Sequence, residues 1–124
     1  MTELYVYGFA ECDQFENPND PDEIEAKTPI PIQIKDPDVK IFKVCCGALH
    51  SVALSTKGIV YTWGCGDNGA LGRTGIEKLP EKIQSIFHPI FDIAAGETHT
   101  IAINPHENIL YLWGFYRVRS KKII

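Results

Sequence analysis

The stretch VCCGALHSVALSTKGIVYTWG, residues 44–64, returns later in the chain as IAAGETHTIAINPHENILYLWG, residues 93–114. The two copies are 49 residues apart at their glycine and histidine and 50 residues apart at their tryptophan. The segment LYVYG, residues 4–8, repeats the closing part of the unit 56 residues earlier. The matched positions are Gly47 with Gly96, His50 with His99, Trp63 with Trp113 and Gly8 with Gly64. A repeat of about 50 residues is therefore the first constraint on the fold.

Each unit contains short apolar runs that are rich in β-branched and aromatic residues and separated by glycine or proline, and such runs predict strands. Alternation places Tyr61 and Trp63 on one face of their strand and Val60 and Thr62 on the other. Four short antiparallel strands in a unit of about 50 residues are typical of a propeller blade. The expected strands are 4–7, 30–34, 41–46, 50–54, 59–63, 81–84, 91–94, 99–103 and 109–113.

The pattern predicts an all-β chain of β-propeller repeats with about two four-stranded antiparallel blades. The expected divisions are a partial blade over 1–40, a full repeat over 41–89 and a partial repeat over 90–124. Even four such blades need about 200 residues, whereas the chain has 124. We expect the N-terminal part of a propeller that self-associates or needs further blades to close, because its outer faces lack neighbours.

The segment GCGDNG, residues 64–69, matches the Gly-x-Gly-x-x-Gly pattern of dinucleotide-binding loops. Such a loop must open a helix, but Gly72, Gly75 and Pro80 follow, and these residues disfavour helices. We therefore interpret the segment as a turn after the third strand of a blade, which disfavours a nucleotide-binding enzyme. The glycines assigned to the structural repeat are Gly8, Gly47, Gly64, Gly69, Gly72, Gly96 and Gly114.

The composition, 44% hydrophobic and 23% charged, is that of a globular chain, and no apolar run approaches the ~20 residues of a membrane span. The N-terminus lacks the basic start of a secretory signal, which favours an intracellular protein. Residues 1–40 carry ten acidic and three basic side chains, which disfavours a nucleic-acid surface there. The acidic stretch 16–29 lacks the ligand spacing of a Ca²⁺ loop and is expected to be a solvated loop. The basic stretch 117–122 fits either a phosphate-contacting or nuclear-import patch or a solvated terminus.

The four cysteines, Cys12, Cys45, Cys46 and Cys65, show no Cys-x-x-Cys spacing, so no metal site is expected. In the repeat, Cys45 and Cys46 take the places that two alanines occupy at 94–95. Small apolar residues at both places indicate packing positions. We therefore expect reduced thiols that serve as small, packed side chains.

The succession Val-x-x-Gly-x-x-His-Ser-x-Ala-Leu, Gly-x-Val-Tyr-x-Trp-Gly and Asp-Asn-Gly-Ala-Leu-Gly-Arg resembles the repeat of the regulator of chromosome condensation family. The resemblance covers nearly the whole chain and is strongest over 44–73 and 90–114. It implies a seven-bladed propeller, and the run Trp-Gly-Phe-Tyr-Arg at 113–117 favours members that are guanine-nucleotide exchange factors for the GTPase Ran. The implied protein is nuclear and chromatin-associated, is not an enzyme, needs no cofactor, and speeds GDP release by binding nucleotide-free Ran.

The resemblance also implies partner-facing residues. Asp67 fits the family's acidic loop position fully, whereas Glu11 falls on a second acidic position whose loop lacks the expected glycines. A third position, acidic in the family, is Val118 in this chain. His50 and His99 are candidates for the same face, with hydrogen-bonded structural histidines as the alternative. Asp67 also has an alternative, which is to bond backbone N–H groups in its own turn.

A partner face of this kind spans several blades, and the chain is too short to supply them. We therefore expect little or no GDP release from the isolated chain. The alternative function is a general repeat-type protein–protein interaction module without exchange activity.

Overall fold

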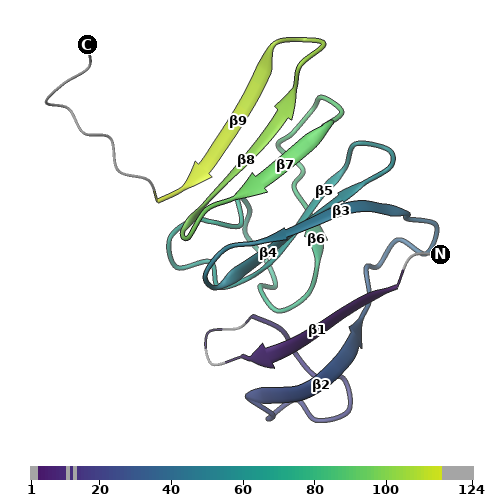
Figure 1. Cartoon of the computed structure of the whole chain (residues 1–124), viewed down its shortest axis with the longest axis vertical. Helices are drawn as coiled ribbons and strands as arrows, with labels where there is room; N and C mark the ends of the chain where they lie inside the picture. The colour runs from purple at the N-terminus through teal and green to yellow at the C-terminus, as the bar shows by residue number, and fades with distance from the viewer. Residues whose placement is uncertain (1–2, 11, 13, 116–124) are drawn as a thin grey trace, which may run out of the picture.

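The computed structural model describes residues 3–10, 12 and 14–115, which form three antiparallel sheets and no helix. The sheets stack side by side in chain order (Figure 1). The first sheet contains β1 (Leu4–Phe9) and β2 (Glu25–Ile32). The middle sheet contains, in spatial order, β3 (Ile41–Cys46), β4 (His50–Ser55), β5 (Val60–Gly64) and β6 (Glu81–Lys82). The third sheet contains β7 (Asp92–Ala95), β8 (His99–Asn104) and β9 (Ile109–Gly114). The predicted all-β fold of antiparallel repeats is confirmed.

One strand boundary differs clearly from the expected one, because β2 begins at Glu25 rather than at residue 30. The cause is the pairing of β1, which continues past a register shift and places Gly8 opposite Ala26 and Phe9 opposite Glu25. Ala26 is 3% exposed and belongs to the core. Part of the acidic stretch that was expected to be a solvated loop is therefore a strand.

The middle sheet is covered on both faces, and the alternation in β5 decides which side chain faces which neighbour. Tyr61 and Trp63 pack in a cluster with Ile32 of the first sheet. Val60 points to the other side and packs in a cluster with Ile93 of the third sheet. Burying a side chain of this size stabilises a fold by about 1.5–3 kcal/mol, so the two clusters hold the stack together.

The outer sheets are incomplete blades within the described part of the chain. In the repeat, β1 and β2 match β5 and β6, so the first sheet has counterparts of only two strands of the middle sheet. Tyr61 is 4% exposed, whereas Tyr5 at the same repeat position is 56% exposed. Likewise Thr62 is 0% exposed and Leu112 is 40% exposed. The same positions are buried where a neighbouring sheet covers them and open where none does.

Candidate functional site

The loop that follows β5, residues 65–73, carries Asp67 at an exposed position. The N–H of Gly69 donates to Gly66 O at 2.9 Å, and the N–H of Gly72 donates to Gly69 O at 3.2 Å. Gly69 and Gly72 have φ angles of 71° and 65°, a left-handed conformation that glycine adopts without the steric cost of a Cβ. The described residues after the loop form turns and bends, as the turn interpretation predicts. No helix N-terminus is therefore available here to hold a phosphate.

Arg73 ties this loop to the sheet. Its Nη2 donates to Thr62 O at 2.6 Å and to Leu79 O at 3.2 Å, and its Nε donates to Thr62 Oγ1 at 3.2 Å. Glu81 Oε2 lies 3.6 Å from Nη1, and the Arg73 side chain is 5% exposed. Burial lowers the pKa of Arg73 and the charge of Glu81 opposes that shift, but an arginine remains protonated. The loop is thus fixed behind Asp67 by charge-assisted hydrogen bonds.

The side chain of Asp67 is exposed on this anchored loop. Its contact in the structure is with Cys12, whose Sγ lies 3.7 Å from Oδ2. Among the described residues, no backbone N–H donates to this carboxylate, so its use within its own turn is not observed. Asp67 is thus an exposed carboxylate on a loop that Arg73 anchors to the sheet.

His50 lies at the seam between the middle and third sheets and is 3% exposed. Its Nε2 is 2.9 Å from Thr100 Oγ1, and that hydroxyl donates to Ala70 O at 3.0 Å. Because the hydroxyl has a single proton, His50 Nε2 carries the proton that joins it to Thr100. Trp113 Nε1 donates to the same Ala70 carbonyl at 2.7 Å. Desolvation lowers the pKa of His50, with a hydrogen bond to the His99 backbone acting in the opposite direction. The imidazole is therefore buried in the seam and hydrogen-bonded to the next sheet.

The structure describes one of the remaining candidates, His99, which begins the central strand of the third sheet. His99, the repeat counterpart of His50, is half-buried in the third sheet. A Cβ at Gly96 would overlap the His99 ring, as a Cβ at Gly47 would overlap the ring of His50, so the Gly-x-x-His step leaves room for each imidazole. Glu11 and Val118 lie outside the described residues. Among the candidates that the structure describes, Asp67 is the one at an exposed, anchored position.

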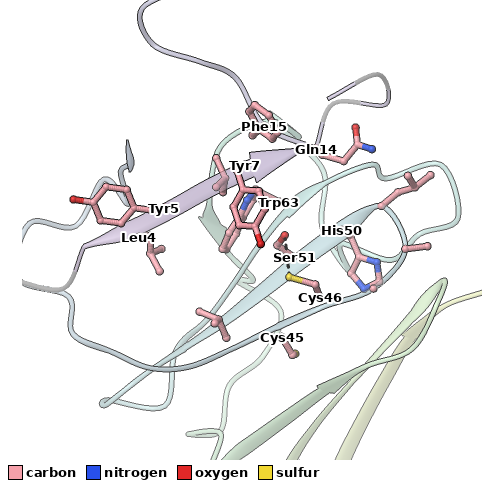
Figure 2. A pocket seen from close by; sticks show the side chains of 15 residues that line it. Leu4, Tyr5, Tyr7, Gln14, Phe15, Cys45, Cys46, His50, Ser51 and Trp63 are labelled. Atoms are coloured by element: carbon pink, nitrogen blue, oxygen red, sulfur yellow. Dashed lines mark hydrogen bonds between the residues drawn. The ribbon is translucent and has the colours of Figure 1, made fainter. Parts of the chain in front are cut away.

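The seam between the first and middle sheets is open, unlike the seam that Ala70 closes. A cavity of about 520 Å³ lies between β1 and β3, lined among others by Leu4, Cys46 and Trp63 (Figure 2). Trp63 Nε1 is buried and has no hydrogen-bond partner in the described part of the chain, whereas Trp113 Nε1 has the Ala70 carbonyl. None of the described residues of the loop after β1 thus supplies an equivalent of that carbonyl.

The cysteines depart from the expectation of reduced, packed thiols. Cys12 and Cys65 form a disulfide, with their Cα atoms 5.4 Å apart. Cys45 is half-buried, and its pKa is raised by burial first and by neighbouring Cys46 second. Cys46 is exposed beside Ser51, with its Sγ 3.7 Å from Ser51 Oγ, so it is not a packed side chain. The 12–65 pair carries no spacing motif and no repeat counterpart, so the sequence offers no signal for it.

These features define a class of protein, an incomplete β-propeller built from repeats whose seam is joined by a histidine, a threonine and a tryptophan. The "Regulator of chromosome condensation (RCC1) repeat" model matches residues 57–103, and a second model of the same repeat matches residues 43–70. The chain therefore belongs to the regulator of chromosome condensation repeat family. The described part of the chain holds no membrane-spanning helix.

Known relatives agree with this assignment. The chain is 34% identical over 98 residues to the human Regulator of chromosome condensation, covering 76% of this chain and 22% of that protein. It is 40% identical over 93 residues to mouse E3 ubiquitin-protein ligase HERC2, covering 71% of this chain and 2% of that protein. The crystal structure of Prp20p from Saccharomyces cerevisiae, described with its binding properties to Gsp1p and histones, superimposes with a TM-score of 0.74 at 25% identity. That match covers 95% of this chain and 30% of Prp20p. The chain thus spans less than a third of the length of each of these relatives.

Proposed function

We propose that the chain supplies part of the partner-binding face of a nuclear, chromatin-associated exchange factor of the Ran type. The observation that carries the proposal is Asp67, which is exposed at the apex of a loop that matches the family pattern and is locked to the sheet by Arg73. The similarity to the human Regulator of chromosome condensation and to Prp20p supports it. Asp67 would act as a fixed negative charge that meets the phosphate-binding and Mg²⁺-binding region of the GTPase.

The proposed mechanism is thermodynamic linkage. A protein that binds nucleotide-free GTPase more tightly than nucleotide-loaded GTPase must weaken nucleotide binding by the same factor. No bond is broken, so the described residues need only present a rigid face. The chain spans less than a third of the relatives, and losing most of a binding face should cost well over the ~4 kcal/mol that separates micromolar from millimolar affinity. We therefore expect weak binding and little or no acceleration of GDP release by the chain alone.

The test measures both properties on a Ran-type GTPase. Release of fluorescent GDP is followed with and without the chain, and binding to nucleotide-free GTPase is measured at increasing chain concentration. Asp67→Ala should weaken whatever binding is present, whereas Asp38→Ala, which removes an exposed aspartate from the turn between β2 and β3, should not. Acceleration of release that Asp67→Ala abolishes would show that the fragment is active. Equal binding by the two variants would remove Asp67 from the interface.

A second candidate function is a general interaction module without exchange activity. The similarity to HERC2, a ubiquitin-protein ligase, favours it, because the same repeat occurs in a protein with a different name and role. The two proposals differ in one measurement. An exchange-factor relative should prefer nucleotide-free over GDP-loaded GTPase, whereas a general module should show no such preference.

A further inference from the structure

The loop that leaves β1 meets the loop that leaves β5 through two sulfur atoms. Cys12 is placed by its own N–H, which donates to Gln14 Oε1 at 2.7 Å. Cys65 is 5% exposed, and its N–H donates to Leu49 O at 2.7 Å. The Cα atoms are 5.4 Å apart across a sequence separation of 53 residues, within the range of about 4.4–6.8 Å found for disulfides. The stacking of the first sheet on the middle sheet brings the two cysteines together. No local sequence motif does so.

We propose that the Cys12–Cys65 disulfide is a reversible redox modification site. Small thiols open it to a dithiol, and thiol oxidants restore the bond that joins the two loops. The oxidants are peroxides and small-molecule disulfides. Cys12 is the more accessible sulfur and reacts first, whereas buried Cys65 resolves the intermediate. The other two cysteines cannot replace them, because Cys45 and Cys46 are neighbours in β3 whose side chains point to opposite faces of the sheet.

The chemistry balances for either oxidant. With hydrogen peroxide, the Cys12 sulfur attacks one oxygen, the O–O bond breaks, and a sulfenic acid and water form. The Cys65 sulfur then attacks the Cys12 sulfur, and the S–O bond breaks with loss of a second water. Two thiols lose two electrons and two protons, and the peroxide takes up both. With a small disulfide, a mixed disulfide at Cys12 is displaced by Cys65, and two small thiols are released.

The state of this pair bears directly on Asp67. In the disulfide, the Sγ of Cys12 lies 3.7 Å from Asp67 Oδ2. After reduction, a thiol at this position would donate a weak hydrogen bond to the carboxylate. Both sulfurs and the carboxylate lie within 4.8 Å of one another. Oxidation removes the S–H donor and tethers Cys65, two residues from Asp67, to the first sheet. The disulfide therefore frees the carboxylate while fixing its loop. This consequence for partner binding rests on the proposed function, whereas the modification itself does not.

The first experiment tests the modification alone. The reduced chain is oxidised with glutathione disulfide in buffer containing EDTA, both in native buffer and in urea, and the bridged peptides are identified by mass spectrometry. We expect the Cys12–Cys65 bridge to exceed every other pairing by at least about tenfold in native buffer, because folding holds the two sulfurs together. In urea this preference should disappear. Cys12→Ser and Cys65→Ser should remove the bridge, and Cys46→Ser should leave it intact.

The proposal would be overturned if the Cys12–Cys65 bridge formed no more selectively in native buffer than in urea. It would also be overturned if Cys45 or Cys46 formed bridges or mixed disulfides faster than the Cys12–Cys65 pair. A second experiment compares the oxidised and reduced chain for binding to nucleotide-free GTPase, with the Cys12→Ser variant treated identically. A several-fold change that is absent from the variant supports the link to Asp67. A selective bridge with no change in binding would refute that link and leave the modification site standing. Absence of binding in both states would count against the proposed function alone.

Discussion

Thr100 is the central link of the seam between the middle and third sheets, and replacing it with valine tests that seam. The side chain is 0% exposed, so Thr100→Val keeps the shape of a buried residue while removing its hydroxyl. Two interactions are lost together. Ala70 O loses the donor at 3.0 Å, and His50 Nε2 loses its acceptor at 2.9 Å.

The expected loss in the free energy of unfolding depends on the hydrogen bonds that Ala70 and His50 retain. Ala70 O still accepts from Trp113 Nε1 at 2.7 Å, so its loss is that of an ordinary hydrogen bond, about 0.5–1.5 kcal/mol. His50 is 3% exposed and is left with a buried N–H that lacks its Thr100 partner, which costs about 1–3 kcal/mol. The valine methyl recovers part of this through packing. We expect a net destabilisation of about 2 kcal/mol, which raises the unfolding equilibrium constant about 30-fold.

The assay is urea unfolding followed by tryptophan fluorescence, since Trp113 reports on this seam and Trp63 on the other. The repeat itself supplies the control. Ser51 occupies the position of Thr100 one unit earlier, but it is half-exposed and its hydroxyl contacts Cys46 Sγ at 3.7 Å. Ser51→Val should therefore change the free energy of unfolding by less than about 0.5 kcal/mol.

Two outcomes would refute this reasoning. One is a Thr100→Val variant within about 0.5 kcal/mol of the unmodified chain, because the seam would then not depend on the hydroxyl. The other is a Ser51→Val variant that is equally destabilised, because the effect would then come from the substitution and not from the network. A changed denaturant slope in either variant would show an altered unfolded or native state and would require a calorimetric measurement instead.

Three further predictions concern pH, loop geometry and association. The folded-state pKa of His50 lies below its ordinary value of about 6.5, so the unfolded chain takes up the proton first as the pH falls. The free energy of unfolding is therefore fully present above about pH 6.5 and decreases below about pH 6.5. Urea midpoints from pH 8 to 5 should show the fall, and His50→Gln should flatten it. A Cβ added by Gly72→Ala would lie 2.9 Å from the Trp113 ring, whereas the nearest atom to a Cβ added by Gly69→Ala is 3.9 Å away. The two φ angles are similar, so Gly72→Ala should lower the free energy of unfolding by at least about 1 kcal/mol more than Gly69→Ala. Equal losses would mean that the φ strain dominates. Leu112 is 40% exposed on the open face of the third sheet, so we expect the chain to self-associate when it is measured by sedimentation velocity. Leu112→Thr should weaken that association. A compact monomer at all concentrations would contradict this prediction.

Much of the fold is predictable from the sequence, because the residue alternation that marks each strand lies within that strand's own sequence. The alternation in 60–63 assigns Tyr61 and Trp63 to one face and Val60 to the other, and these side chains pack in the two separate clusters expected of a sheet covered on both sides. The glycines after β5 are by themselves enough to disfavour a helix, and the residues there form turns and bends. Period-2 alternation and turn chemistry depend only on neighbouring residues, so a single sequence reveals them.

Other features exist only in the stacked structure. The sequence leaves His50 open between a partner face and the interior. Its hydrogen bond to Thr100, which lies in the next sheet at a separation of 50 residues, appears only in the structure. The early start of β2 depends on the bulge in β1, and the Cys12–Cys65 pair depends on two exit loops meeting across a seam. Each of these contacts is set by the distance and rotation between sheets. That geometry is the sum of side-chain packing on both faces, and no local pattern of residues encodes it.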